Sequence, residues 1–176
     1  MADTVAVSGR MEVLDWRGDK ASLLQLGLVG AATLLPAVCH LAGAPVRVFL
    51  PMHWPVLLAG LVYGWRGGLA VGMAAPLASF ALSGMPSAAL LPAMGAEIAA
   101  YGLCAGLARE AFRFNAYASA AMAVLAGRAV YAASALASGA QFGLVSAALV
   151  PGAVAAVLQI ALLPSLAEKW VGKERG

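Results

Sequence analysis

Apolar stretches recur along the chain and are separated by short turns rich in glycine, proline and charge. A membrane-spanning helix needs about 20 consecutive, mostly apolar residues, and most of the sequence after a polar start meets that requirement. We expect spanning helices at 21–43, 55–64, 69–83, 88–108, 115–138 and 144–167. The pattern therefore predicts an all-α integral membrane protein built as a six-transmembrane-helix bundle.

The polar segments at the two ends set the expected domain organisation. Residues 1–20 are predicted to be a cytoplasmic N-terminal tail, 21–167 the six-helix membrane domain, and 168–176 a cytoplasmic C-terminal tail. The first 20 residues are polar and charged, so we expect no cleavable signal peptide there.

The positions of the basic residues test this layout. With the N-terminus in the cytoplasm, nine of the eleven Lys and Arg residues fall on the cytoplasmic side: Arg10, Arg17, Lys20, Arg66, Arg109, Arg113, Lys169, Lys173 and Arg175. Only Arg47 falls in an outer loop, and Arg128 lies within a span. Cytoplasmic loops carry an excess of Lys and Arg, so the pattern predicts that both termini are cytoplasmic. The same bias explains the net charge of +3, and no nucleic-acid partner is implied.

Composition supports the membrane class and narrows the chemistry. The chain is 62% hydrophobic and 11% charged, whereas soluble domains are about 25% charged. It contains no phosphate-binding loop, no HExxH and no GxSxG motif, and its two histidines are too few for most metal sites. Cys39 and Cys104 stand alone and are expected to be small apolar fillers. We expect no cofactor.

The stretch 50–68 differs most from its surroundings. Two prolines flank a histidine and a tryptophan, so Pro51 to Trp54 is predicted to form a shaped loop, with Pro55 opening a helix. The glycines and the charged residue at 64–68 predict a tight turn. We interpret the loop as the lid of a small-molecule site, with His53, Trp54 and Arg47 as candidate binding or gating residues. A merely solvated His53 is the alternative.

Two charged residues, Glu97 and Arg128, lie about 15 Å deep in their predicted spans. Charges at that depth are costly unless they are paired or hydrated, and they often mark a site or pathway. They could form an ion pair that only fixes helix packing, or they could face a polar ligand. Tyr101 lies one turn from Glu97 on the same face, and Tyr131 is three residues from Arg128. Gln159, in the last span, could bond a neighbouring helix or the ligand.

Three functional classes are consistent with these residues: a binding subunit of an ATP-driven importer, a stand-alone facilitator or secondary carrier, and a small intramembrane enzyme. The enzyme would have only Glu97 and His53 as acid–base candidates and no evident nucleophile. The carrier class would be favoured by an internal repeat, and the sequence has no convincing one.

The run LPMHWPVLLAGLVYGWRGG and its continuation to residue 107, with the segment 127–132 around Arg128 and PGAVAAVLQIALLP around Gln159, resembles the substrate-binding S components of energy-coupling factor (ECF) vitamin transporters. The resemblance implies a six-helix plasma-membrane protein, not an enzyme, that captures a water-soluble vitamin or related metabolite. It also implies a membrane scaffold (T) subunit and two ATPase subunits as partners, with the scaffold contacted by small residues of the first helix, here Gly27 and Ala31. The Pro-Met-His loop and the Glu97 to Gly102 segment look closest to pantothenate-type members.

Overall fold

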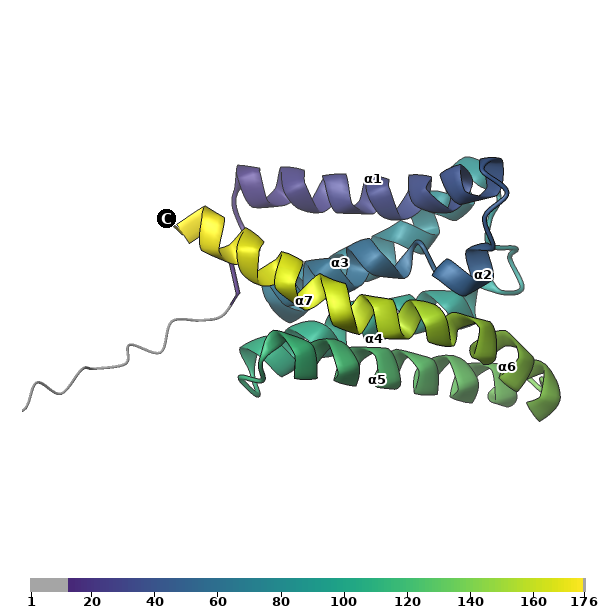
Figure 1. Cartoon of the computed structure of the whole chain (residues 1–176). Helices are drawn as coiled ribbons and strands as arrows, with labels where there is room; N and C mark the ends of the chain where they lie inside the picture. The colour runs from purple at the N-terminus through teal and green to yellow at the C-terminus, as the bar shows by residue number, and fades with distance from the viewer. Residues whose placement is uncertain (1–12, 176) are drawn as a thin grey trace, which may run out of the picture.

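The computed structural model describes residues 13–175, and every regular element in that range is helical (Figure 1). The elements are α1 (Asp19–Leu41), α2 (Val46–Phe49), α3 (His53–Ser83), α4 (Leu91–Glu110), α5 (Ala116–Ala137), α6 (Phe142–Leu149), the 3-10 turn η1 (Val150–Gly152) and α7 (Ala153–Arg175). Five helical stretches in this part of the chain are long and apolar enough to cross a membrane. The first twelve residues of the predicted N-terminal tail, with Arg10, lie outside the described residues.

The long helix α3 contains a reversal of chain direction at Gly64. This residue has φ 71° and ψ −169°, a conformation that favours glycine because it has no Cβ. A methyl group at Gly68 would lie 2.7 Å from Cα of Gly60, and one at Gly72 would lie 3.3 Å from a methyl of Val56. In a straight helix, residues eight positions apart, such as Gly60 and Gly68, would be about 12 Å apart, and residues sixteen positions apart about 24 Å. The part of α3 before Gly64 and the part after it, its two arms, must therefore run antiparallel and side by side. The turn expected at 64–68 is thus present, but it is confined to Gly64, and Trp65 to Gly68 already belong to the second arm.

Both arms of α3 pack on α4 through glycines. A methyl at Gly60 would lie 2.8 Å from Cβ of Ala105, and a methyl at Gly68 would lie 2.6 Å from the carbonyl carbon of Gly102. Small residues let helices approach until their backbones touch, which is the usual way helices associate where no water drives them together. The core of the described chain is centred on this α3–α4 contact.

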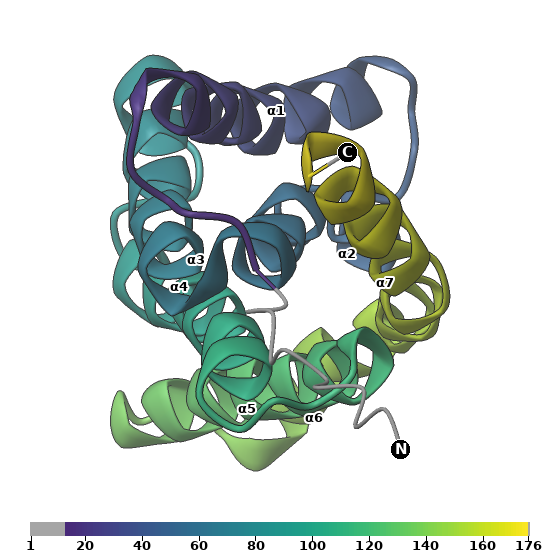
Figure 2. The same ribbon diagram turned by 90° about the vertical axis from the view of Figure 1, so that its left-hand side faces the viewer.

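Helix α1 lies at the edge of the bundle and is the least buried of the candidate spans (Figures 1 and 2). It packs against α3, and only Gln25, Leu28 and Ala32 of its residues are buried. The view along the bundle in Figure 2 shows α1 and α5 on opposite sides, with α3 and α4 between them.

Both ends of the described chain lie at the same end of the bundle. We call it the basic end, because Lys20, Arg66 and Arg175 lie there. Lys20 at the start of α1 pairs with Glu174 of α7 at 2.6 Å, and Arg175 donates to the carbonyl of Val13 at 2.9 Å. The chain between Val13 and α1 crosses this end, because the amide of Leu14 donates to the carbonyl of Val62 at 2.7 Å.

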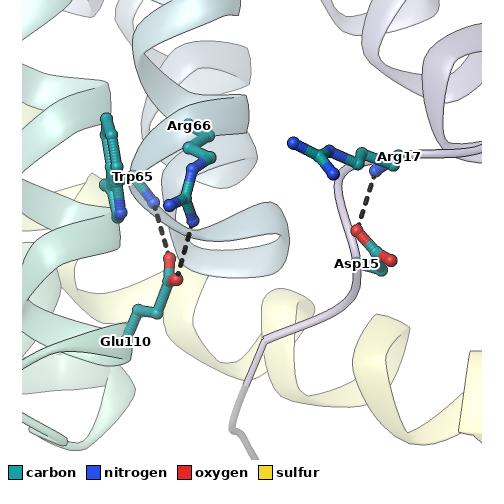
Figure 3. A network of polar contacts seen from close by, with 5 residues as sticks. All are labelled: Asp15, Arg17, Trp65, Arg66 and Glu110. Atoms are coloured by element: carbon teal, nitrogen blue, oxygen red, sulfur yellow. Dashed lines mark hydrogen bonds and ion pairs between the residues drawn. The ribbon is translucent and has the colours of Figure 1, made fainter.

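The reversal of α3 and the end of α4 meet at the same basic end. Glu110 accepts from the backbone amide of Trp65 at 3.3 Å and pairs with Arg66 at 3.4 Å, while Asp15 accepts from the amide of Arg17 at 3.0 Å nearby (Figure 3). A methyl at Gly64 would lie 3.5 Å from a methyl of Val13. Lys20, Arg66 and Arg175 therefore share one end of the molecule, as the expected distribution of basic residues requires.

Three expected boundaries are corrected by the structure. Helix α3 begins at His53, inside the segment predicted to be a loop, because a proline at position 55 is tolerated in a first helical turn whose amides need no partner. The preceding segment forms the short helix α2, which ends at Phe49 and is followed by Leu50 in a left-handed conformation (φ 47°, ψ 54°). The last span is broken into α6, η1 and α7 where Pro151 interrupts it, and α7 continues beyond residue 167 to Arg175.

Candidate ligand-binding site

The centre of the candidate site is an ion pair between neighbouring helices. Nη1 of Arg128, on α5, lies 3.0 Å from Oε1 of Glu97, on α4. Glu97 is 3% exposed and the Arg128 side chain 17% exposed. Glu97 lies six residues, about 9 Å, from the start of α4, and Arg128 nine residues, about 14 Å, from the end of α5. The sequence placed these two charges at matched depth, and the structure brings them into contact.

His53 joins this pair from a third helix. Its Nε2 lies 3.4 Å from the same Oε1 of Glu97, and its side chain is 2% exposed. The solvated outer-loop position considered for His53 is wrong, since the residue is buried in the first turn of α3. The start of α3 faces α4 here, and this carries the imidazole inward.

Tyr101 completes the α4 side of the cluster. Its ring meets the His53 ring edge-on at a centroid separation of 4.8 Å, and the residue is fully buried. Gly127 on α5 makes room for it, because a methyl group there would overlap the Tyr101 ring. The side chains of Arg128 and Glu97 lie near the Tyr101 hydroxyl, although no contact of this hydroxyl with a described residue has hydrogen-bond geometry.

The segment before α7 closes around Arg128. A methyl group at Gly152 would overlap Nη2 of Arg128 and would lie 2.8 Å from Cδ1 of Leu50. The guanidinium is therefore held between α5, η1 and the turn that follows α2. Gly127 and Gly152 were not singled out from the sequence. The available signals were a glycine next to Arg128 and a glycine after Pro151, but glycines are frequent throughout this chain.

Gln159, on α7, is a further polar residue and is fully buried. Neither its amide nitrogen nor its amide oxygen has a hydrogen-bond partner among the described residues. The expectation that it bonds a neighbouring helix is therefore not met there.

Several other buried polar atoms of the cluster also lack hydrogen-bond partners in the described part of the chain. They are both ring nitrogens of His53, Oε1 of Glu97, the hydroxyl of Tyr101 and Nη2 of Arg128. Glu97 is electrostatically paired, but its contact with Arg128 does not have hydrogen-bond geometry. Native proteins satisfy about 90% or more of their buried polar groups, so this concentration of unsatisfied atoms marks the cluster as the candidate site.

The remaining candidates lie outside this cluster. The indole of Trp54 donates to the carbonyl of Phe49 at 2.8 Å, so its N–H closes the turn between α2 and α3. Arg47 is exposed on α2, and Tyr131 is half-buried on α5. Neither shares a hydrogen bond or ion pair with the cluster between residues 13 and 175. No group of three potential metal ligands occurs within that range either.

The fold and the site together define a class: a multi-pass helical membrane protein with a buried polar cluster between α3, α4 and α5. The chain belongs to the family of ECF transporter substrate-specific components, because the model for the ECF transporter, substrate-specific component, matches residues 22–171. Members of this family are substrate-binding subunits of transporters and not enzymes, so the intramembrane enzyme hypothesis is set aside. Comparison with curated proteins and with solved structures gave no match.

Proposed function

We propose that this protein is the ligand-capturing subunit of an ECF-type, ATP-driven importer for a small water-soluble vitamin or related metabolite. One observation carries the proposal beyond family membership: buried polar atoms of His53, Glu97, Tyr101 and Arg128 that lack hydrogen-bond partners among the described residues converge from three helices. The alternative in which the ion pair only fixes helix packing provides no hydrogen-bond partner for the buried Tyr101 hydroxyl or for Nη2 of Arg128.

The orientation follows from charge. The basic end carries Lys20, Arg66 and Arg175 together, and by the positive-inside rule it faces the cytoplasm of a plasma-membrane protein. The two arms of α3 then cross the membrane separately, which gives six crossings with both termini inside. His53 is buried at the opposite end of the first arm, which is then the end nearer the outside, from where the ligand enters.

Helix α1 supplies the proposed contact with the scaffold (T) subunit. A methyl group at Gly27 would meet no atom within 4 Å, and the residue is exposed. Ala31 lies one turn further on the same side and is half-buried. This small-residue face is open within the monomer, so a partner helix can approach it closely. The scaffold subunit would carry two ATPase subunits, which supply the energy.

The resemblance to pantothenate-type members is carried by Pro51, Met52 and His53 with the segment from Glu97 to Gly102. Of these residues, the structure brings His53, Glu97 and Tyr101 into contact. Pantothenate is therefore the first ligand to try.

The test is ligand binding by the purified protein in detergent, without scaffold or ATPase subunits. Pantothenate, biotin, nicotinate, thiamine and riboflavin would be titrated by isothermal calorimetry. We expect saturable binding of at least one, weakened at least about tenfold, or 1.4 kcal/mol, in Arg128→Ala. Lys169→Ala, an exposed change at the basic end, is the matched control and should bind normally. Absence of binding for the whole panel would contradict the proposed function.

A further inference from the structure

Within the cluster, the cationic side chain of Arg128 and the anionic side chain of Glu97 differ in how many charged or polar neighbours they have. Arg128 presents one nitrogen, Nη1, to Glu97, while Nη2 is buried and without a hydrogen-bond partner among the described residues. Oε1 of Glu97, by contrast, already has two cationic or proton-donating neighbours, Arg128 at 3.0 Å and His53 at 3.4 Å. The cluster thus retains a cationic nitrogen, Nη2 of Arg128, that faces no carboxylate among the described residues, whereas Oε1 of Glu97 already lies near two positively charged or proton-donating groups.

The shape of the donor favours a planar anion. A guanidinium presents its N–H groups in a flat fork that matches a carboxylate, and such charge-assisted hydrogen bonds are about twice as strong as neutral ones. Gly152 and Leu50 hold the Arg128 fork in place. The neutral groups of Tyr101 and Gln159 can bond the hydroxyl or amide groups that accompany the carboxylate in a metabolite.

Binding of a carboxylate would add a negative charge to the buried cluster, and protonation of His53 would neutralise it. Without ligand, Arg128 and Glu97 carry one charge of each sign, and a bound carboxylate would leave the buried cluster with a net charge of −1. Burying an unbalanced charge is costly, and the system shifts protonation instead. The ionisable groups that face His53 are Glu97 and Tyr101 on α4, with Arg128 on α5 beyond them. Histidine is the side chain that ordinarily gains a proton near neutral pH.

We infer that the ligand of this site carries a carboxylate that binds Nη2 of Arg128, and that its binding is accompanied by protonation of His53. Glu97 is then a positioning residue that orients the guanidinium and stabilises the imidazolium. This inference rests on the proposed function and specifies the class of substrate: a small monocarboxylate with hydrogen-bonding groups. The ligand-bound state holds one proton more than the free state, so lowering the pH favours binding.

The first experiment compares acids with their uncharged counterparts on the full-length protein. The pairs are pantothenate and pantothenol, nicotinate and nicotinamide, and biotin and biotinamide, with thiamine and riboflavin as ligands that lack a carboxylate. We expect one acid to bind and its counterpart to bind at least about tenfold more weakly, since a hydrogen bond to a charged group is lost. Equal binding of an acid and its counterpart would overturn the inference.

The second experiment measures proton uptake for the acid that binds. Calorimetry in two buffers of different ionisation enthalpy should show about one proton taken up per ligand above the titration range of histidine, and affinity should rise as pH falls from about 8 to 6, by up to about tenfold per unit. Proton uptake is measured on the wild-type protein, so the result does not require that any variant folds. Absence of proton uptake would overturn the role of His53.

The two histidines of the chain provide a matched pair of variants. His53→Gln should abolish proton uptake and flatten the pH dependence, whereas His40→Gln, a change at an exposed position of α1, should leave both unchanged. Uptake that persists in a folded His53→Gln protein would assign the proton to another group and overturn the inference. Tight binding of thiamine or riboflavin alone would also overturn it, while the proposed function would stand. If no compound binds, the proposed function itself fails.

Discussion

At the scale of single residues, the site depends as much on absent side chains as on present ones. The Tyr101 ring occupies space that a methyl group at Gly127 would take, and Nη2 of Arg128 occupies space that a methyl group at Gly152 would take. Tyr101 and Arg128 are thus each accommodated by a glycine on a facing element. The position of the guanidinium is set from α5, η1 and α4 together.

Gly152→Ala should therefore weaken ligand binding without unfolding the protein. The new methyl group meets the end of a flexible arginine side chain, which can move aside, and the moved guanidinium no longer matches the ligand. We expect a loss of affinity of about tenfold, or 1.4 kcal/mol, by calorimetry, with little change in melting temperature. Gly143→Ala is the matched control, because a methyl group there meets nothing within 4 Å. Unchanged affinity in Gly152→Ala would separate Arg128 from ligand binding.

The sequence predicted the chemistry of this cluster better than its geometry. Intramembrane charge singled out Glu97 and Arg128, and helical spacing added Tyr101, since these signals depend only on hydropathy and period. The burial of His53 was missed because it depends on where α3 begins and on which helix faces it. Trp54 and Arg47 were grouped with His53 by proximity in sequence, but the side chain of Trp54 turns back to Phe49.

At the scale of elements, the packing of the two antiparallel arms of α3 against α4 positions the residues of the site. It fixes the start of α3, with His53, relative to Glu97 and Tyr101 on α4. The helices touch backbone to backbone at Gly60, Gly68 and Gly102. If one of these glycines were replaced by a larger residue, its side chain would meet backbone atoms, which cannot move aside as a flexible side chain can.

Gly68→Ala should accordingly destabilise the whole protein. The added methyl group would lie 2.6 Å from the carbonyl carbon of Gly102 and 2.7 Å from Cα of Gly60, and neither backbone can yield without separating the helices. Overpacking of this kind costs about 1–3 kcal/mol, which thermal unfolding in detergent would detect as a lower melting temperature. Gly95→Ala on the same helix pair is the control, since its methyl would lie 4.0 Å from the nearest atom, on Pro76. Equal melting temperatures for the two variants would contradict this account of the packing.

The reversal within α3 shows where sequence reasoning about elements succeeds. Four glycines between residues 60 and 68 predicted a turn, and Gly64 supplies it with a backbone conformation that other residues rarely adopt. The pattern did not show that the turn needs only one residue, because Glu110 of α4 caps it by accepting from the amide of Trp65. That stabilising contact is 45 residues away in sequence, beyond the reach of local signals.

At the scale of the whole molecule, the ligand cluster and the basic end lie at opposite ends of the first arm of α3. The arm runs from His53, in contact with Glu97, to Gly64, beside Glu110 and Val13. Helix α1 flanks this axis and contributes little to the core, with only Gln25, Leu28 and Ala32 buried. Its open face lies apart from the polar cluster, which lies on α3, α4 and α5, so a partner at this face would not disturb the proposed ligand site.

Gly27→Leu should separate binding from transport. The leucine would project from the open face of α1 and prevent close approach of the scaffold helix, while the ligand cluster lies on other helices. We expect ligand affinity of the purified variant to match the wild type and uptake by cells that express the energising subunits to fall about tenfold, as a loss of about 1.4 kcal/mol in subunit association would give. Ala133→Leu, which adds the same bulk at an exposed position of α5, should affect neither measurement. Parallel loss of binding and uptake in Gly27→Leu would place α1 within the ligand site. Normal uptake, particularly in cells that lack the ATPase subunits, would instead favour a stand-alone carrier.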